Sequence, residues 1–156
     1  MEKPKNLKRS GDPHKFFSRS EKKKIVKAIR TAEKETSGEI RLHLEKHSRK
    51  PVFDRAIEVF DKIGMGGTAL KNGVLIYLAS SDQQFVILGD KGINEIVPEN
   101  FWNDVISMMG QRFKEDKFCE GVCEGITVIG EKLKVFFPLI AGDQNELSNE
   151  ISIPDE

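Results

Sequence analysis

Three side chains that could ligate a metal ion each adjoin a glycine in the middle of the chain: Glu39, Asn72 and Asp90. Carboxylate, amide and backbone oxygens are the mixture of ligands that hard cations such as calcium prefer. Glycine lets the backbone turn so that its carbonyl oxygens can point inward. These residue types therefore indicate a divalent-metal site, provided that the fold brings them together.

The segment from Asn72 to Asp90 predicts a β-hairpin. Two apolar runs, 74–79 and 85–88, flank a short polar turn. Runs of this length and β-branched content are typical of buried strands, and the short joint makes them antiparallel. The outer ends of the hairpin, Asn72-Gly73 and Gly89-Asp90, therefore lie at the same edge of a sheet.

The remaining periodicity predicts the layers around this hairpin. Helices are expected from a capping box at Ser18, from Pro51, from Pro98 and over 118–137, and a strand over 39–45 whose apolar and polar residues alternate. The alternation predicts a half-buried strand. A right-handed crossover makes this strand parallel to 74–79. The fold class is therefore α/β, a three-layer α/β/α sandwich with a small mixed sheet.

This topology places Glu39, the loop 64–72 and the loop 89–98 at one sheet edge, where Glu95 also lies and Glu35 is close in sequence. An alternative is that these polar side chains make only turn hydrogen bonds while the glycines adopt positive φ angles.

Length and charge divide the chain into three parts. Its 156 residues suit one domain. Residues 1–34 hold twelve Lys and Arg against four Asp and Glu, and no Lys or Arg follows Lys134. We expect a flexible basic lead over 1–17, a domain over 18–137 and an acidic tail over 138–156.

Several classes of protein lack support in the sequence. No apolar stretch is long enough to span a membrane, and the N-terminus has no secretory signal, so a cytoplasmic protein is expected. The spacing of Cys119 and Cys123 matches neither a redox motif nor a zinc motif. The basic N-terminal third has too few aromatic residues to predict sequence-specific nucleic-acid binding.

Three motifs in order resemble the TPM domain: Thr36-Ser37-Gly38-Glu39-Ile40, then Asn72-Gly73-Val74-Leu75, then Gly89-x-x-Gly92-Ile93 before Pro98. This family includes thylakoid-lumen proteins linked to photosystem II repair, proteins described as acid phosphatases, and bacterial proteins of unknown role. The resemblance implies the α/β/α sandwich and a divalent-metal site in loops at one sheet edge, with calcium as the ion. Carried over to this chain, the ligands are Glu39, Asn72 and Asp90.

The chain departs from the family pattern at two places. Lys71 stands where many members have an acidic residue, and Gly89-Asp90-Lys91-Gly92 replaces a Gly-aromatic-Gly loop. Most members also carry a signal peptide and a membrane anchor, and we expect neither in this chain. It therefore resembles a stand-alone bacterial cytoplasmic branch of the family.

Three functions are compatible with these residues. The first is a metal-binding module without turnover that acts through a protein partner, with calcium as the ion and magnesium as the alternative. The second is a metal-assisted phosphatase in which Asp90 is ligand or nucleophile and Lys91 holds a phosphate oxygen. The third is an electrostatic adaptor built on the basic N-terminus and the acidic tail, for which residues 1–15 would matter and Asp90 would not.

Overall fold

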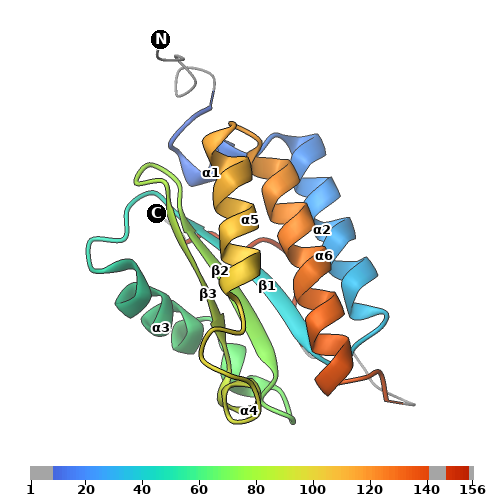
Figure 1. Ribbon diagram of the computed structural model, residues 1–156. Helices are drawn as coiled ribbons and strands as arrows, with labels where there is room; N and C mark the ends of the chain where they lie inside the picture. Colours follow the sequence, from blue (N-terminus) through green and yellow to red (C-terminus); the bar gives the residue numbers. More distant parts are fainter. Residues whose placement is uncertain (1–8, 141–146, 155–156) are drawn as a thin grey trace.

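The computed structural model describes residues 9–140 and 147–154 of the chain. A mixed three-stranded sheet has helices on both faces, which confirms the expected three-layer α/β/α sandwich (Figure 1). The elements follow one another as α1 (Pro13–Phe16), α2 (Arg19–Glu33), β1 (Glu39–Glu45), α3 (Val52–Lys62), η2 (Met65–Gly67), β2 (Gly73–Ala79), β3 (Gln84–Gly89), α4 (Lys91–Asn94), α5 (Asn103–Lys114) and α6 (Phe118–Phe136).

Strand β2 lies at the centre of the sheet and is buried along its whole length. It pairs in parallel with β1, where Glu39 stands opposite Gly73. It pairs antiparallel with β3, where Val74 stands opposite Gly89. The start of β1, the start of β2 and the end of β3 therefore share one sheet edge, as the predicted topology requires.

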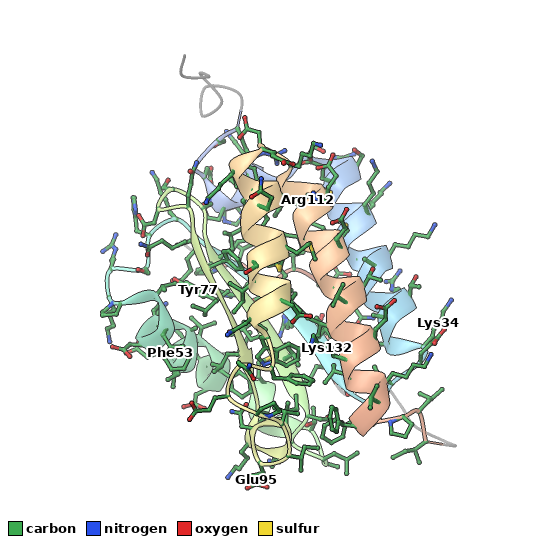
Figure 2. All side chains as sticks on the ribbon, in the orientation of Figure 1. Lys34, Phe53, Tyr77, Glu95, Arg112 and Lys132 are labelled. Carbon is green, nitrogen blue, oxygen red and sulfur yellow. The ribbon has the colours of Figure 1, made fainter. Side chains whose placement is uncertain are left out.

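Two hydrophobic cores hold the layers together. The larger core lies between the sheet and helices α2, α5 and α6, and the smaller one lies between the sheet and α3 (Figure 1). Tyr77 of β2 belongs to the smaller core, whereas Phe53 on α3 is exposed (Figure 2). Helix α6 packs closely on its neighbours, because a Cβ added at Gly125 would lie 2.4 Å from Met109 Sδ.

Helix α5 begins later than the sequence predicts. It starts at Asn103, not at Pro98. Between them the backbone forms β-turns, in which Phe101 N donates to Pro98 O and Asn103 N to Asn100 O. These hydrogen bonds join residues three apart, as in tight turns, whereas those of an α-helix join residues four apart.

The described part of the expected lead packs against the domain. Phe16 and Phe17 are buried in the larger core, directly before the capping box that Ser18 forms with Glu21. Residues 1–8 lie outside the described part. The folded region therefore begins before residue 18.

The described part of the expected acidic tail pairs with β1 through an isolated parallel bridge between His43 and Ser152. Ser152 N donates to Leu42 O at 2.8 Å, and Leu44 N donates to Ser152 O at 2.9 Å. The segment 147–154 thus lies along the free edge of β1, and we call it the C-terminal strap. The helices within the described residues include none that is both long and apolar enough to cross a membrane.

The strap explains a difference from the expected strand. The polar face of β1 is buried: Glu39, His43 and Glu45 are each largely removed from solvent. The expectation of a half-buried strand is therefore wrong for this face, because the strap and Arg55 of α3 cover it.

Candidate functional site

The two sides of the predicted site meet at Gly73. Glu39 N donates to Asn72 O at 3.3 Å on one side of β2, and Asp90 N donates to Gly73 O at 2.9 Å on the other. The backbone thus brings Glu39, Asn72 and Asp90 to one edge of the sheet. We call this the strand-start edge.

Asp90 is buried with only one of its carboxylate oxygens satisfied. Its Oδ1 accepts a 2.7 Å hydrogen bond from Lys91 N and caps the short helix α4. Its Oδ2 is buried and has no hydrogen-bond partner among the described residues. The residue is 8% exposed. A buried carboxylate oxygen without a donor is costly, because it has lost water and gained nothing in return.

Asn72 shows the same feature. It is 1% exposed, and its side-chain Nδ2 donates to Ser37 Oγ at 3.3 Å. Its Oδ1 is buried and has no partner among the described residues. Its own N–H donates to Thr68 Oγ1 at 3.2 Å, which fixes the loop before β2. Two unsatisfied acceptor oxygens therefore lie on neighbouring loops of the strand-start edge.

Glycine allows these two loops to touch. A Cβ added at Gly92 would lie 2.3 Å from Leu70 O and 2.4 Å from Lys71 O, closer than any real side chain comes. The turn of α4 thus packs directly on the backbone that leads to Asn72. Any larger residue at position 92 would push the loops apart.

Glu39 is buried and already accepts a hydrogen bond. Its Oε1 accepts from Leu147 N of the C-terminal strap at 2.5 Å. Nearby, Glu33 Oε2 accepts from Ile40 N at 2.8 Å. Burial raises the pKa of Glu33 to about 8, and the Glu39 carboxylate adds to the rise. The start of β1 therefore concentrates acidic groups, one of which keeps its proton at neutral pH.

Sequence reasoning did not include Glu33. A usable signal was present, because Glu33 continues the four-residue spacing of Ile25 and Ile29, the buried residues of α2. An acidic residue on a buried helical stripe indicates either a partner or a raised pKa.

A family model described as the TPM domain matches residues 11–132. The chain belongs to the TPM domain family. The NMR structure of BA42 protein from the psychrophilic bacterium Bizionia argentinensis is similar at 48% identity and a TM-score of 0.85, covering 90% of this chain and 97% of that one. No curated protein matches.

A second structure supports the fold alone. The N-terminal domain of a P. gingivalis protein, solved by NMR, shares 17% identity with a TM-score of 0.63, and the match covers 78% of each chain.

Some residues that the sequence suggested for the metal site are exposed in the TPM domain. Glu35 is exposed and pairs with Lys134 at 2.9 Å, and Glu95 is exposed. Lys91 is also exposed. Across residues 9–140 and 147–154, no three His, Cys, Asp or Glu side chains are grouped so that they could hold a metal ion. An ion at the strand-start edge would therefore depend on the Asn72 amide and backbone oxygens as well as on carboxylates.

A second buried polar group lies farther along the sheet, centred on Glu45. This carboxylate accepts from Arg55 Nε at 2.9 Å, Arg55 Nη2 at 2.5 Å and Tyr77 Oη at 2.7 Å, and His43 Nε2 lies 3.1 Å away. His43 Nδ1 is 2.9 Å from Ser152 Oγ of the strap. We call these five residues the Glu45 network.

The pKa shifts in this network describe its charge. Burial lowers the pKa of His43, so the ring is neutral at pH 7, with Nε2–H facing Glu45 and Nδ1 accepting from Ser152. Burial alone would raise the pKa of Glu45, but hydrogen bonds from Arg55, Tyr77 and His43 hold it at about 2. At neutral pH Glu45 is therefore an anion paired with Arg55, and the network connects β1, β2, α3 and the strap.

Proposed function

We propose that this TPM domain is a divalent-metal-binding module and that its ion, calcium, binds at the strand-start edge. Asn72 Oδ1 and Asp90 Oδ2 are the side-chain ligands, and Glu39 is the third. The observation that carries this proposal is the pair of buried oxygens on adjoining loops that have no donor within the described residues. A hard cation would supply the positive charge that these oxygens lack.

The chemistry of the donors favours calcium over magnesium. Two carboxylates, one amide oxygen and nearby backbone carbonyls form an irregular set, which the flexible coordination of calcium accepts. Magnesium requires a near-ideal octahedron and keeps several of its own waters, so we expect it to bind more weakly here. Glu39 would have to share its carboxylate with the Leu147 amide.

Binding without turnover fits this geometry better than phosphoryl transfer does. Asp90 is 8% exposed, and one of its oxygens already caps α4. A nucleophile must reach an incoming phosphorus atom, and a buried capping carboxylate cannot do so without movement of the loop. The phosphatase alternative, with Asp90 and Lys91, therefore needs a rearrangement that metal binding does not. A protein partner would then bind the metal-loaded form of the domain in preference to the metal-free form.

Calorimetric titration of metal-stripped protein tests the proposal. Calcium should bind saturably to the wild type, and Asp90→Asn should weaken binding by at least about tenfold, because it removes one of the two anionic ligands. Asparagine is a good helix cap, so this variant keeps the α4 contact. Asp116→Asn is the matched control, since Asp116 has a φ of +66°, a conformation that Asn tolerates well.

Two outcomes would contradict the proposal. If millimolar calcium and magnesium both give no heat of binding, the protein has no site for either ion. Equal binding by wild type and Asp90→Asn would place the ion elsewhere. Calcium-dependent hydrolysis of a phosphomonoester that is lost in Asp90→Asn would favour the phosphatase instead.

A further inference from the structure

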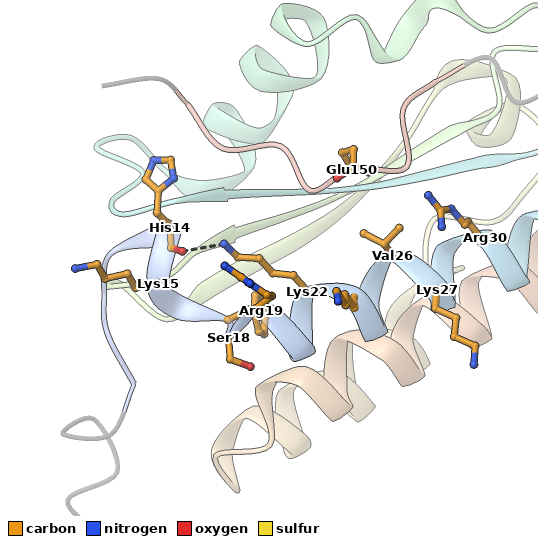
Figure 3. Close-up of a pocket in the computed structure, with 11 residues that line it drawn as sticks. His14, Lys15, Ser18, Arg19, Lys22, Val26, Lys27, Arg30 and Glu150 are labelled. Atoms are coloured by element: carbon orange, nitrogen blue, oxygen red, sulfur yellow. Dashed lines mark hydrogen bonds between the residues drawn. The ribbon is translucent and has the colours of Figure 1, made fainter.

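A second feature of the molecule lies away from the strand-start edge, between helix α2 and the C-terminal strap. The groove there is open to solvent and has a volume of about 930 Å³ (Figure 3). Most of its lining is basic: Lys15, Arg19, Lys22, Lys23, Lys27 and Arg30. Its one carboxylate is Glu150, which the strap carries on the opposite wall. We call this the cationic groove.

The cations of the groove are concentrated on one surface and have no acidic partner among the described residues, whereas several other cations are paired. Arg55, Arg112, Lys132 and Lys134 each form an ion pair with a carboxylate. None of the six basic residues of the groove forms one with a carboxylate of the described residues. The chain has no net charge, so this local excess is a property of the surface and not of the composition. Such a concentration of one sign attracts and steers anionic partners.

Helix α2 presents these cations on a rigid frame. Ile25 and Ile29 are fully buried, so the helix cannot rotate its basic side away from the groove. From Arg19 to Arg30 the helix rises about 16 Å at 1.5 Å per residue. A polypeptide in extended conformation covers the same length with about five residues. Half-buried Val26 and the aliphatic stems of the lysines add apolar surface between the charges.

The lining and the shape of the groove favour an acidic polypeptide over two other kinds of anionic partner. Single-stranded nucleic acids need several exposed rings on which successive bases stack, whereas the lining offers only the exposed ring of His14, because Phe17 is buried. A membrane surface is broad, whereas these charges line a concavity that is closed on one side by the strap. An extended segment with several carboxylates matches both the charge of the groove and the length of the row of cations on α2. The side chain of Glu150 already places one carboxylate at this wall.

We propose that the cationic groove binds an extended acidic segment of a partner polypeptide, with its carboxylates along α2 and its backbone beside the strap. The site is separate from the metal site and does not require an ion. Lys22 is partly engaged, because its Nζ donates to His14 O at 2.9 Å (Figure 3). Arg19 and Arg30, which are both exposed and stand at the two ends of the row, are the best residues to test.

The experiment follows backbone amide shifts of the full chain, in chelator, as a glutamate peptide of about six residues is added. Shifts should be saturable, should map to residues 14–30 and 148–152, and should weaken as ionic strength rises from about 0.01 M to about 0.15 M, where screening shortens to about 8 Å. A neutral peptide of equal length should cause none. Arg19→Gln/Arg30→Gln should weaken binding about tenfold.

The control carries the same change in net charge at exposed lysines outside the groove, Lys46→Gln/Lys62→Gln, and should bind like the wild type. Equal weakening in both double variants would reduce the effect to net charge and overturn the proposal. Absence of peptide shifts would also overturn it. If an anionic vesicle or an oligonucleotide binds the same residues more tightly than the glutamate peptide, that molecule is the partner of the groove and the acidic segment is not.

Discussion

Arg55 of α3 should be worth far more to stability than a surface arginine, because it neutralises a buried anion. The change to examine is Arg55→Met, which keeps an aliphatic side chain and removes the guanidinium. In the wild type the Glu45 side chain is 7% exposed and that of Arg55 is 23% exposed. The variant leaves the carboxylate of Glu45 in place with only Tyr77 and His43 as donors.

The pKa of Glu45 sets the size of the effect. Its fall from 4.5 to about 2 corresponds to about 3 kcal/mol of stability at pH 7, at about 1.4 kcal/mol per unit. Because the folded-state pKa is depressed, this contribution is present above pH 4.5 and is lost as the pH falls toward 2. Arg55 supplies two of the hydrogen bonds that cause the shift. Arg55→Met should therefore lower the free energy of unfolding by about 2 to 4 kcal/mol at pH 7.

Urea unfolding followed by fluorescence of Trp102, the single tryptophan, measures this difference directly. The curves should be compared at pH 7 and near pH 3, where Glu45 begins to take up protons. The matched control is Arg112→Met, which removes an exposed pair with Glu124 and should change stability by less than about 1 kcal/mol.

Two results would refute the reasoning. A loss below about 1 kcal/mol for Arg55→Met at pH 7 would mean that water reaches Glu45 and screens it. A difference between wild type and variant that stays constant from pH 7 to pH 3 would mean that the guanidinium acts through packing and not through the carboxylate charge.

Four further variants test the packing and the boundaries of the domain. Gly92→Ala should destabilise the protein by about 2 kcal/mol in thermal unfolding, because its Cβ would lie 2.3 Å from a backbone oxygen, whereas Gly110→Ala has open space and should be neutral or stabilising. Ser18→Ala should cost about 1 kcal/mol through loss of the capping box. Ser152→Pro removes the strap amide that bonds to β1, so the Leu44 amide should exchange with solvent faster in NMR; unchanged exchange would show that the strap does not protect β1.

Much of the fold could be predicted because its signals are local. The apolar runs 74–79 and 85–88, the alternation over 39–45 and the capping box at Ser18 each lie within a few residues of sequence. Chain direction then follows from the right-handed crossover and the short hairpin. The meeting of Glu39, Asn72 and Asp90 at one edge is a consequence of that topology, so it was predictable without any long-range contact.

The rest depends on contacts between distant parts of the chain. His43 and Glu45 lie on the polar face predicted by alternation, and their burial depends on residues farther along the chain: Ser152 contacts His43, and Arg55 and Tyr77 contact Glu45. The late start of α5 depends on turns after Pro98, whose helix-starting signal is permissive and not decisive. The cationic groove likewise needs the strap as its second wall, and a run of lysines on a helix does not by itself reveal a concavity.

The most direct test of the metal site is a map of backbone amide shifts as calcium is added to metal-stripped protein. We predict saturable shifts confined to residues 38–40, 64–73 and 89–95, which carry the ligands Glu39, Asn72 and Asp90 and the glycines beside them. Shifts that are absent up to millimolar calcium, or that fall on other parts of the sheet, would contradict a metal site at the strand-start edge.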